Sequence, residues 1–280
     1  MLLRPLALIL AALTVLGSMA CSTPSIVYQR LDWLADWRLN DYVTLNPEQK
    51  AQFNRDFGEL WRWHREQELP AYASDMRELA AALDSSVTPA QIADYSERFR
   101  GHWQRAMART VPALCPVVQS FDEAQVQEIL DEVDEDTEKY LKDSVEPSAK
   151  ELRRNSEQRM GKWIKRWNGP LNARQQELLK QWSGQRRATA PEWLDYRQQW
   201  RSQLEQALRD RKSSARCEPL EALFVNSADL RSARLAALMA HNETLWQEFI
   251  ADIIAAAEPR QGAHAQAELR EFAGQLDQLR

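Results

Sequence analysis

Three carboxylates near the start of the chain alternate with aromatic residues. Asp32 and Asp36 are four positions apart, as are Trp33 and Trp37, so a helix would place carboxylates and rings in adjacent stripes. A carboxylate desolvated beside an indole ring can acquire a raised pKa and act as a general acid. Pairing with nearby arginines, or helix capping, explains the same residues without chemistry, and we favour it because no second catalytic group accompanies them. We therefore predict no catalytic residue and treat this set as a candidate interaction surface: Asp32, Trp33, Asp36, Trp37, Asp41 and Tyr42.

The four histidines form no metal-binding pattern. None lies three residues after a glutamate, so the Glu-x-x-His motif of di-iron bundles is missing, and so is His-Glu-x-x-His. Glycine-rich phosphate loops are also missing, because the glycines are widely spaced. We expect the histidines to lie in or beside helix interfaces, and we predict no metal, no cofactor and no enzymatic activity. The histidines are His64, His102, His241 and His264.

The chain has three cysteines, and their number bears on its location. Neither Cys115 nor Cys217 belongs to a Cys-x-x-Cys redox motif. We expect them to form a structural disulfide in an oxidising compartment, with two separate buried thiols as the alternative. This assignment leaves Cys21 as an odd thiol that needs its own explanation.

The first twenty residues have the features of an export signal. Arg4 gives a positive start, and residues 6–16 form an apolar run too short to cross a bilayer. Small residues then lead to Cys21, which resembles the lipobox of bacterial lipoproteins, although Ser18 and Met19 depart from its usual leucine. We predict a lipoprotein signal peptide over 1–20, a lipidated Cys21 in a tether over 21–25, and a helical domain over 26–280. Ordinary signal cleavage, which would release a soluble periplasmic protein, is the alternative.

A lipidated Cys21 would make the membrane the first partner of the chain. Several acyl chains on one cysteine would give a stable anchor. Ser22 stands where an aspartate often retains lipoproteins at the inner membrane, so resemblance to that sorting rule favours the outer membrane. We expect the protein to face the periplasm from there.

The formal net charge of the 280 residues is −5, and removal of the signal would take away only one basic residue, Arg4. A negative chain has no bulk attraction for phosphate, so we predict no nucleic-acid partner. Eleven tryptophans lie among long stretches rich in Glu, Gln, Arg, Ala and Leu. Rings in such stretches more often fill a helical core than line a groove, and they predict an all-α protein.

Four short segments share a pattern that opens helices. An apolar residue precedes Asn46, Thr88, Asp122 or Asn172, and a glutamine follows three positions later. This is a capping box, in which the cap and the glutamine satisfy each other's backbone amides. Together with the apolar stripes that follow, the boxes predict a single elongated bundle of about eight or nine helices. We expect Pro70 to kink or break a helix, and later prolines, including Pro112 and Pro116, to mark connections.

Charge is segregated between two neighbouring stretches. Residues 122–136 are acidic and residues 150–166 are basic. We expect two helices packed side by side with complementary solvated faces. The alternative is a basic patch that faces anionic envelope polymer or lipid headgroups.

Residues 28–42, followed by Leu-Asn-Pro-Glu-Gln at 45–49, resemble the opening of an uncharacterised family of Gram-negative lipoproteins with a domain of unknown function, DUF 6279. This resemblance implies an envelope location and a helical fold, and it implies no chemistry. The boxes at 45–49 and 171–175 are also similar, more weakly, to the Leu-Thr-x-x-Gln motifs of periplasmic chaperones of the Spy and CpxP type.

These observations lead to three functional hypotheses. The first is a non-enzymatic, lipid-anchored, periplasm-facing protein that binds an envelope protein or polymer. The second is a chaperone or holdase that holds exported polypeptides in an aromatic groove. The third is a hydrolase of envelope polymer that acts through Asp32 or Asp36.

Overall fold

The computed structural model describes residues 39–213 and 217–279, and within these ranges the chain is helical with no strand. The predicted all-α fold is confirmed. Its α-helices are α4 (Pro47–Trp63), α5 (Leu69–Ala82), α6 (Pro89–Gln119), α7 (Glu123–Tyr140), α8 (Ala149–Asn168), α9 (Ala173–Gln185), α10 (Ala190–Arg209), α11 (Glu218–Val225), α12 (Ala233–Ala255) and α13 (Pro259–Gln278). Two π-helical turns, η1 (His64–Glu68) and η2 (Leu141–Val145), and a 3₁₀ turn, η3 (Ser227–Leu230), complete them.

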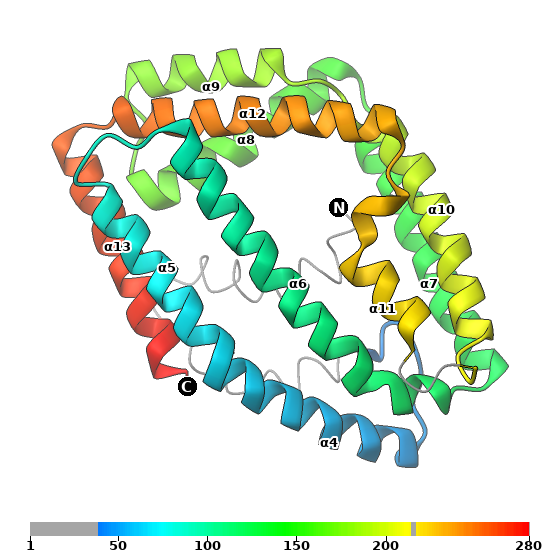
Figure 1. The fold of residues 1–280 in the computed structure, drawn as a ribbon. Coiled ribbons are helices and arrows are strands. Elements are labelled where there is room, and N and C mark those ends of the chain that lie inside the picture. Colours follow the sequence, from blue (N-terminus) through cyan, green and yellow to red (C-terminus); the bar gives the residue numbers. More distant parts are fainter. Residues whose placement is uncertain (1–38, 214–216, 280) are drawn as a thin grey trace.

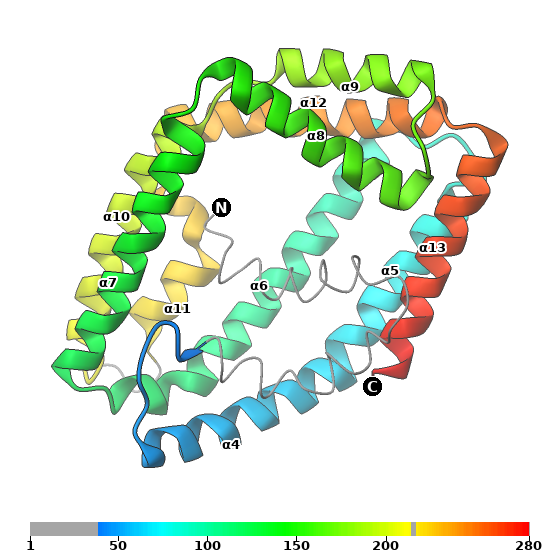
Figure 2. The ribbon, with the colours of Figure 1, turned by 180° about the vertical axis from the view of Figure 1, so that it is seen from behind.

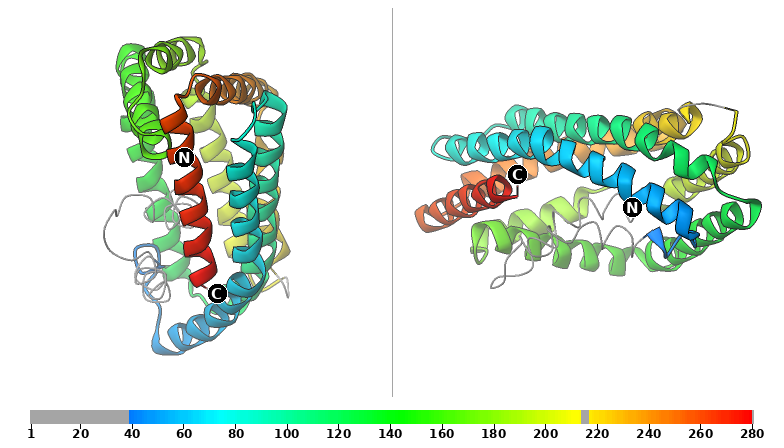
Figure 3. Two further views of the ribbon diagram at one scale, coloured as in Figure 1. Left: turned by 90° about the vertical axis from the view of Figure 1, so that its left-hand side faces the viewer. Right: turned by 90° about the horizontal axis from the view of Figure 1, so that it is seen from below.

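The helices pair along the edges of a frame, and α6 crosses it diagonally (Figure 1). α5 packs along α13, α7 along α10, and α9 lies between α8 and α12. The view from behind shows the same pairs at the edges (Figure 2), and the side views show that the frame is shallow compared with its width (Figure 3). No helix among the described residues has the length and apolar character that a bilayer crossing requires.

The apolar core is divided among the edges of this frame. One cluster joins α6, α7, α10 and α11, a second joins α5 to α13, and a third joins α8, α9 and α12. Because α6 contributes to both the first and the third cluster, it ties opposite edges together. One cavity lies between the second and third clusters, and another lies within the first.

Pro70 does not break the chain's path. It is the second residue of α5, and α4, η1 and α5 form one continuous helical rod that bends between α4 and α5 (Figure 1). The proline lacks an N–H, and the π-helical turn before it changes the local hydrogen-bond register. With these two helices counted as one rod, the described residues agree with the expected eight or nine helices.

The expectation that Pro112 and Pro116 mark connections is wrong, because both lie inside α6. They are one turn apart and therefore on one face of the helix. Pro116 is exposed, so water can hydrate carbonyls that lose their helical partners there. The buried side chains nearby, among them Cys115 and Val117, hold the helix against the core.

All four predicted capping boxes form. Three of them, together with a further box at Glu258, meet in pairs. Gln49 of α4 and Gln125 of α7 bond each other's amides, with Nε2 to Oε1 distances of 2.9 and 2.7 Å. Gln261 of α13 donates to Gln175 of α9 over 2.9 Å in the same way. Each pair joins the starts of two helices that are far apart in sequence, so these glutamines fix corners of the frame.

Replacing Gln175 with methionine should lower the free energy of unfolding by about 2 kcal/mol. Gln175 is fully buried and accepts from the Asn172 amide and from Gln261, and it donates to the Ile253 carbonyl. Methionine has a similar volume but cannot replace these hydrogen bonds, so the former partners of Gln175 are left unpaired. Each buried polar group that loses its partner costs roughly 1–3 kcal/mol of stability. Chemical denaturation measures the difference.

Gln91 provides the matched control, because it completes an exposed capping box and bonds only to Thr88. Gln91→Met should cost about 0.5–1 kcal/mol, the usual value of a cap. Equal losses for the two variants would contradict a role for Gln175 in joining helices.

Candidate functional site

Most of the predicted interaction surface lies outside the described residues. This applies to Asp32, Trp33, Asp36 and Trp37, and also to Cys21. Of the remaining two, Asp41 is exposed, and Tyr42 donates its hydroxyl to Asp136 Oδ2 over 3.1 Å. Tyr42 also lines a cavity beside α7 and α10.

Cys115 and Cys217 form a disulfide with an S–S distance of 2.09 Å. Both residues are almost fully buried, at 1% and 2% exposure. Cys115 lies on α6, and Cys217 precedes α11 in a left-handed conformation with φ of 53°. The bond therefore attaches the short helix α11 to the long diagonal helix.

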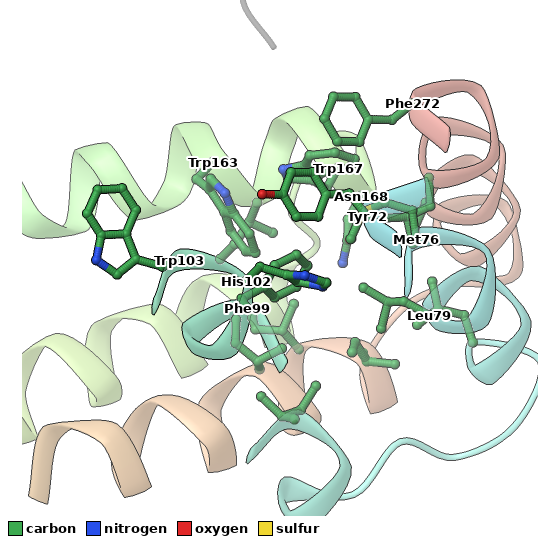
Figure 4. Close-up of a pocket in the computed structure, with 18 of the residues that line it drawn as sticks. Tyr72, Met76, Leu79, Phe99, His102, Trp103, Trp163, Trp167, Asn168 and Phe272 are labelled. Carbon is green, nitrogen blue, oxygen red and sulfur yellow. The ribbon is translucent and has the colours of Figure 1, made fainter. Parts of the chain in front are cut away.

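The described part of the frame contains two apolar cavities. The first, here called the α5–α13 cavity, has a volume of about 410 Å³ and lies among α5, α6, α8, α12 and α13 (Figure 4). The second, the α7–α10 cavity, has a volume of about 590 Å³ and lies among α6, α7, α10, α11 and α12. Both volumes fall in the range of about 300–1,000 Å³ that is typical of ligand sites.

Aromatic side chains from different helices surround the α5–α13 cavity (Figure 4). Two large apolar side chains are exposed in the described ranges, Phe99 at 42% and Trp163 at 43%, and both line this cavity. Trp163 is held edge-on against Trp246, with 5.6 Å between ring centroids. Exposed rings that adjoin a concave apolar surface make this cavity a candidate interaction site.

The tryptophans divide between core and cavity. Trp182 is buried in the core, as expected, whereas Trp163 and Trp167 line the α5–α13 cavity and the buried Trp200 lines the α7–α10 cavity. Trp61 is partly buried and packs against the α5–α13 cluster.

A buried ion network forms part of the wall of the same cavity. His102 on α6 lies between Asp75 of α5, 2.7 Å from Nε2, and Glu68 of η1, 3.2 Å from Nδ1. Arg105 donates to Glu68 through Nε over 3.0 Å and also contacts His102 Nδ1. Arg98 donates to Asp75 over 3.2 Å. The network connects α6 to the rod formed by α4 and α5.

This arrangement leaves His102 without a ring nitrogen for a substrate. Nε2 faces Asp75, and Nδ1 faces Glu68 with Arg105 beside it, so both ring nitrogens already have partners inside the network. What His102 offers the cavity is its ring, which packs edge-on against Tyr72 at 4.6 Å. In the described ranges, no group of three or more His, Cys, Asp or Glu side chains could hold a metal ion.

The sequence did not predict this network, although the spacing of its two carboxylates could have indicated them as buried residues. Glu68 and Asp75 are seven residues apart, two turns of a helix, and lie among the buried residues Leu69, Tyr72 and Met76. Two carboxylates on an apolar face need partners. The partner, His102, comes from a helix that crosses in space, which the local pattern does not reveal.

His64 makes stability depend on pH. Burial lowers the pKa of His64 from 6.5 to about 4, more than the opposing effect of Glu68 raises it. The unfolded chain therefore binds a proton between pH 6.5 and about 4 that the folded protein does not, so the free energy of unfolding falls as pH falls through this window. We expect a loss of about 2 kcal/mol from this group between pH 6.5 and 4.5.

His64→Phe should keep the stacking against Trp61, whose ring centroid is 5.1 Å away, and remove the titration. Denaturation curves of both proteins at several pH values would measure the difference. A variant that loses stability with pH as steeply as the natural chain would contradict the assignment.

The expected packing of the acidic stretch against the basic stretch is wrong. α7 carries the acidic residues and packs on α10, while α8 carries the basic residues and packs on α9 and α13. η2 and a turn separate the two helices and direct them along different edges of the frame (Figure 2). On α8, Lys162 and Lys165 are exposed beside Trp163 and form no ion pair with any described residue.

Comparison with known proteins identifies a family. A family model described as "Family of unknown function (DUF6279)" matches residues 41–249. No curated protein and no solved structure matches the chain, so the similarity to Spy- and CpxP-type chaperones has no support there.

Proposed function

Because the chain belongs to the DUF6279 family, whose function is unknown, its activity has to be inferred from its own geometry, and we propose that it is a non-enzymatic binding protein of the cell envelope. Its partner is an apolar segment of another envelope protein, flanked by acidic side chains. The observation that supports this most is the pair of exposed rings, Phe99 and Trp163, on one apolar cavity.

The chemistry of the cavity favours an apolar occupant. Its walls are almost entirely aliphatic and aromatic, and the polar side chains among them, His102, Tyr72 and Asn168, are few. Aromatic anchors in a desolvated pocket supply most of the energy of protein interfaces. An apolar segment inserted between Phe99 and Trp163 would remove both exposed rings from water.

The charge of α8, the helix that carries Trp163, favours an acidic flank on that segment. Lys162 and Lys165 precede and follow Trp163 in the sequence of α8, and both are exposed on that helix. Unpaired rim charges mainly steer encounter and select partners of opposite charge. A partner with acidic residues beside its apolar group would match both parts of this surface.

The proposed location follows from the N-terminal sequence. We propose that Cys21 is lipidated and that the anchor holds the protein on the periplasmic side of the outer membrane. Intact mass of membrane-extracted protein should show acyl groups on Cys21, and Cys21→Ser should release the chain to the soluble fraction. Unmodified Cys21 in the membrane fraction would contradict the anchor.

A photo-crosslinking residue at position 163 tests the binding function in cells. We expect one discrete adduct, with a yield that falls at least tenfold when Lys162 and Lys165 are both changed to glutamate. The same residue at position 180, exposed on α9 and away from the cavity, is the control and should give no adduct. Absence of any adduct at 163 would contradict the proposal.

The result also separates the alternative function. A holdase binds many clients, so position 163 would then give a ladder of adducts that is insensitive to the two charge reversals. The two cavities lined by aromatic rings are the feature that a holdase would use.

A further inference from the structure

The α7–α10 cavity differs from the first in having a charged side chain without a counter-ion. Arg231, at the end of η3, lines this cavity. Its Nε is buried and has no hydrogen-bond partner, and the guanidinium forms no ion pair with any described residue. Its Cζ lies 5.8 Å from the centroid of the Trp193 ring.

An unpaired N–H of this kind is costly. A buried donor without an acceptor loses roughly 1–3 kcal/mol relative to one that is satisfied, and more when the group is charged. The ring of Trp193 compensates only part of this, because a cation–π contact replaces no hydrogen bond. An anionic group in the cavity would supply the counter-ion that this guanidinium lacks among the described residues.

The other charged groups of the cavity face α7 and already have partners. Arg197 donates from Nε to Thr137 Oγ1 over 3.3 Å and lies over the Tyr140 ring. Asp136 accepts from Tyr42, and Asp143 also has a partner. The Arg231 end of the cavity is therefore the positive end.

Away from these charged groups, the walls of the cavity are apolar. Side chains from α6, α7, α10, α11 and α12 form its walls, among them Leu114, Ile129, Trp200, Leu223 and Met239. A largely apolar cavity of about 590 Å³ that has a cation without a counter-ion at one end has the form of a site for an amphiphile.

From these observations we propose that the α7–α10 cavity binds a single-chain amphiphile with a carboxylate head, a long-chain fatty acid, with the head on Arg231 and the tail along the apolar walls. This site is separate from the cavity of the proposed function. A fatty acid presents two acceptor oxygens to a guanidinium, which favours a carboxylate over a neutral head group.

Isothermal titration calorimetry of the full mature chain with dodecanoate and with dodecan-1-ol tests the head group. We expect dodecanoate to bind at least tenfold more tightly than the alcohol. Arg231→Gln should remove that preference by weakening dodecanoate at least tenfold, and Arg231→Lys should recover part of it because the charge is retained. Trp163→Ala, in the other cavity, should leave dodecanoate binding unchanged even if crosslinking at that cavity fails.

Arg234→Gln is the matched control, because Arg234 is a largely exposed arginine three residues away that pairs with Glu192. Its affinity for dodecanoate should equal that of the natural chain. No binding of dodecanoate, equal binding of acid and alcohol, or an unchanged affinity in Arg231→Gln would each overturn the proposal. Tighter binding of an apolar peptide through its C-terminal carboxylate would overturn the ligand class.

Discussion

Replacing Cys115 and Cys217 with alanine is expected to lower the free energy of unfolding by about 4 kcal/mol. The disulfide joins residues 102 positions apart, and in the chain-entropy account a closed loop of about 100 residues contributes about 4.7 kcal/mol. It also holds α11, a helix of eight residues, which is too short to be stable without tertiary contacts. Urea denaturation in a Cys21→Ser background, which avoids thiol exchange, measures the loss.

Reduction provides the control for this prediction. A reducing agent should lower the free energy of unfolding of the chain with both cysteines by about the same amount. It should leave the free energy of unfolding of the double alanine variant unchanged. This comparison separates the contribution of the disulfide to the free energy of unfolding from the effect of the small change in packing at the two buried sites. A natural chain whose unfolding midpoint is the same with and without reductant would show that the bond contributes nothing.

The starts of the helices were predictable because their information is local. A cap and its glutamine are three residues apart, so Asn46, Thr88, Asp122 and Asn172 each contain the whole interaction in one stretch of sequence. The box at Glu258 was missed because glutamate is not a preferred cap residue. It forms because its Gln261 is held by Gln175 of a distant helix.

Which helices meet was not predictable from the same patterns. Segregated charge indicated that the acidic and basic helices pack together, but each pairs with another helix. Charges on exposed faces contribute little energy, whereas buried apolar stripes and the paired glutamines decide the packing. The same reasoning explains α6, where tertiary burial of Cys115 and its neighbours overrides the local preference of two prolines.

The candidate sites depend on these non-local arrangements. Phe99 and Trp163 come from α6 and α8, and they share a cavity only because α6 crosses the frame. Arg231 could not be selected from the sequence, because the sequence does not show whether an arginine side chain has a hydrogen-bond acceptor in the folded protein. The sequence identified residue types suited to binding, and the fold determines which of them face a cavity.

Replacing His102 with leucine is expected to lower the free energy of unfolding by about 3–4 kcal/mol. Leucine fills similar space but removes the ring that contacts Asp75 and Glu68. Both carboxylates would stay buried, because Asp75 is only 7% exposed and Glu68 only 4%. Removing one partner of a buried ionic group typically costs about 3–5 kcal/mol, because the remaining charges stay desolvated. Denaturation at pH 7 measures the loss.

A combined variant tests the cause of that loss. Replacing Glu68 with methionine, Asp75 with leucine and His102 with leucine removes every buried charge of the network together, so most of the stability should return despite the larger change in sequence. The surface pair of Arg201 and Asp134, with side-chain exposures of 23% and 51%, is the control, and Asp134→Asn should cost less than about 1 kcal/mol. If the triple variant were less stable than His102→Leu, the network would stabilise the fold by itself, and buried charge would not be the reason for the loss. If it recovers, Glu68, Asp75 and His102 are retained for the path of α6 across the frame, which brings Phe99 to Trp163.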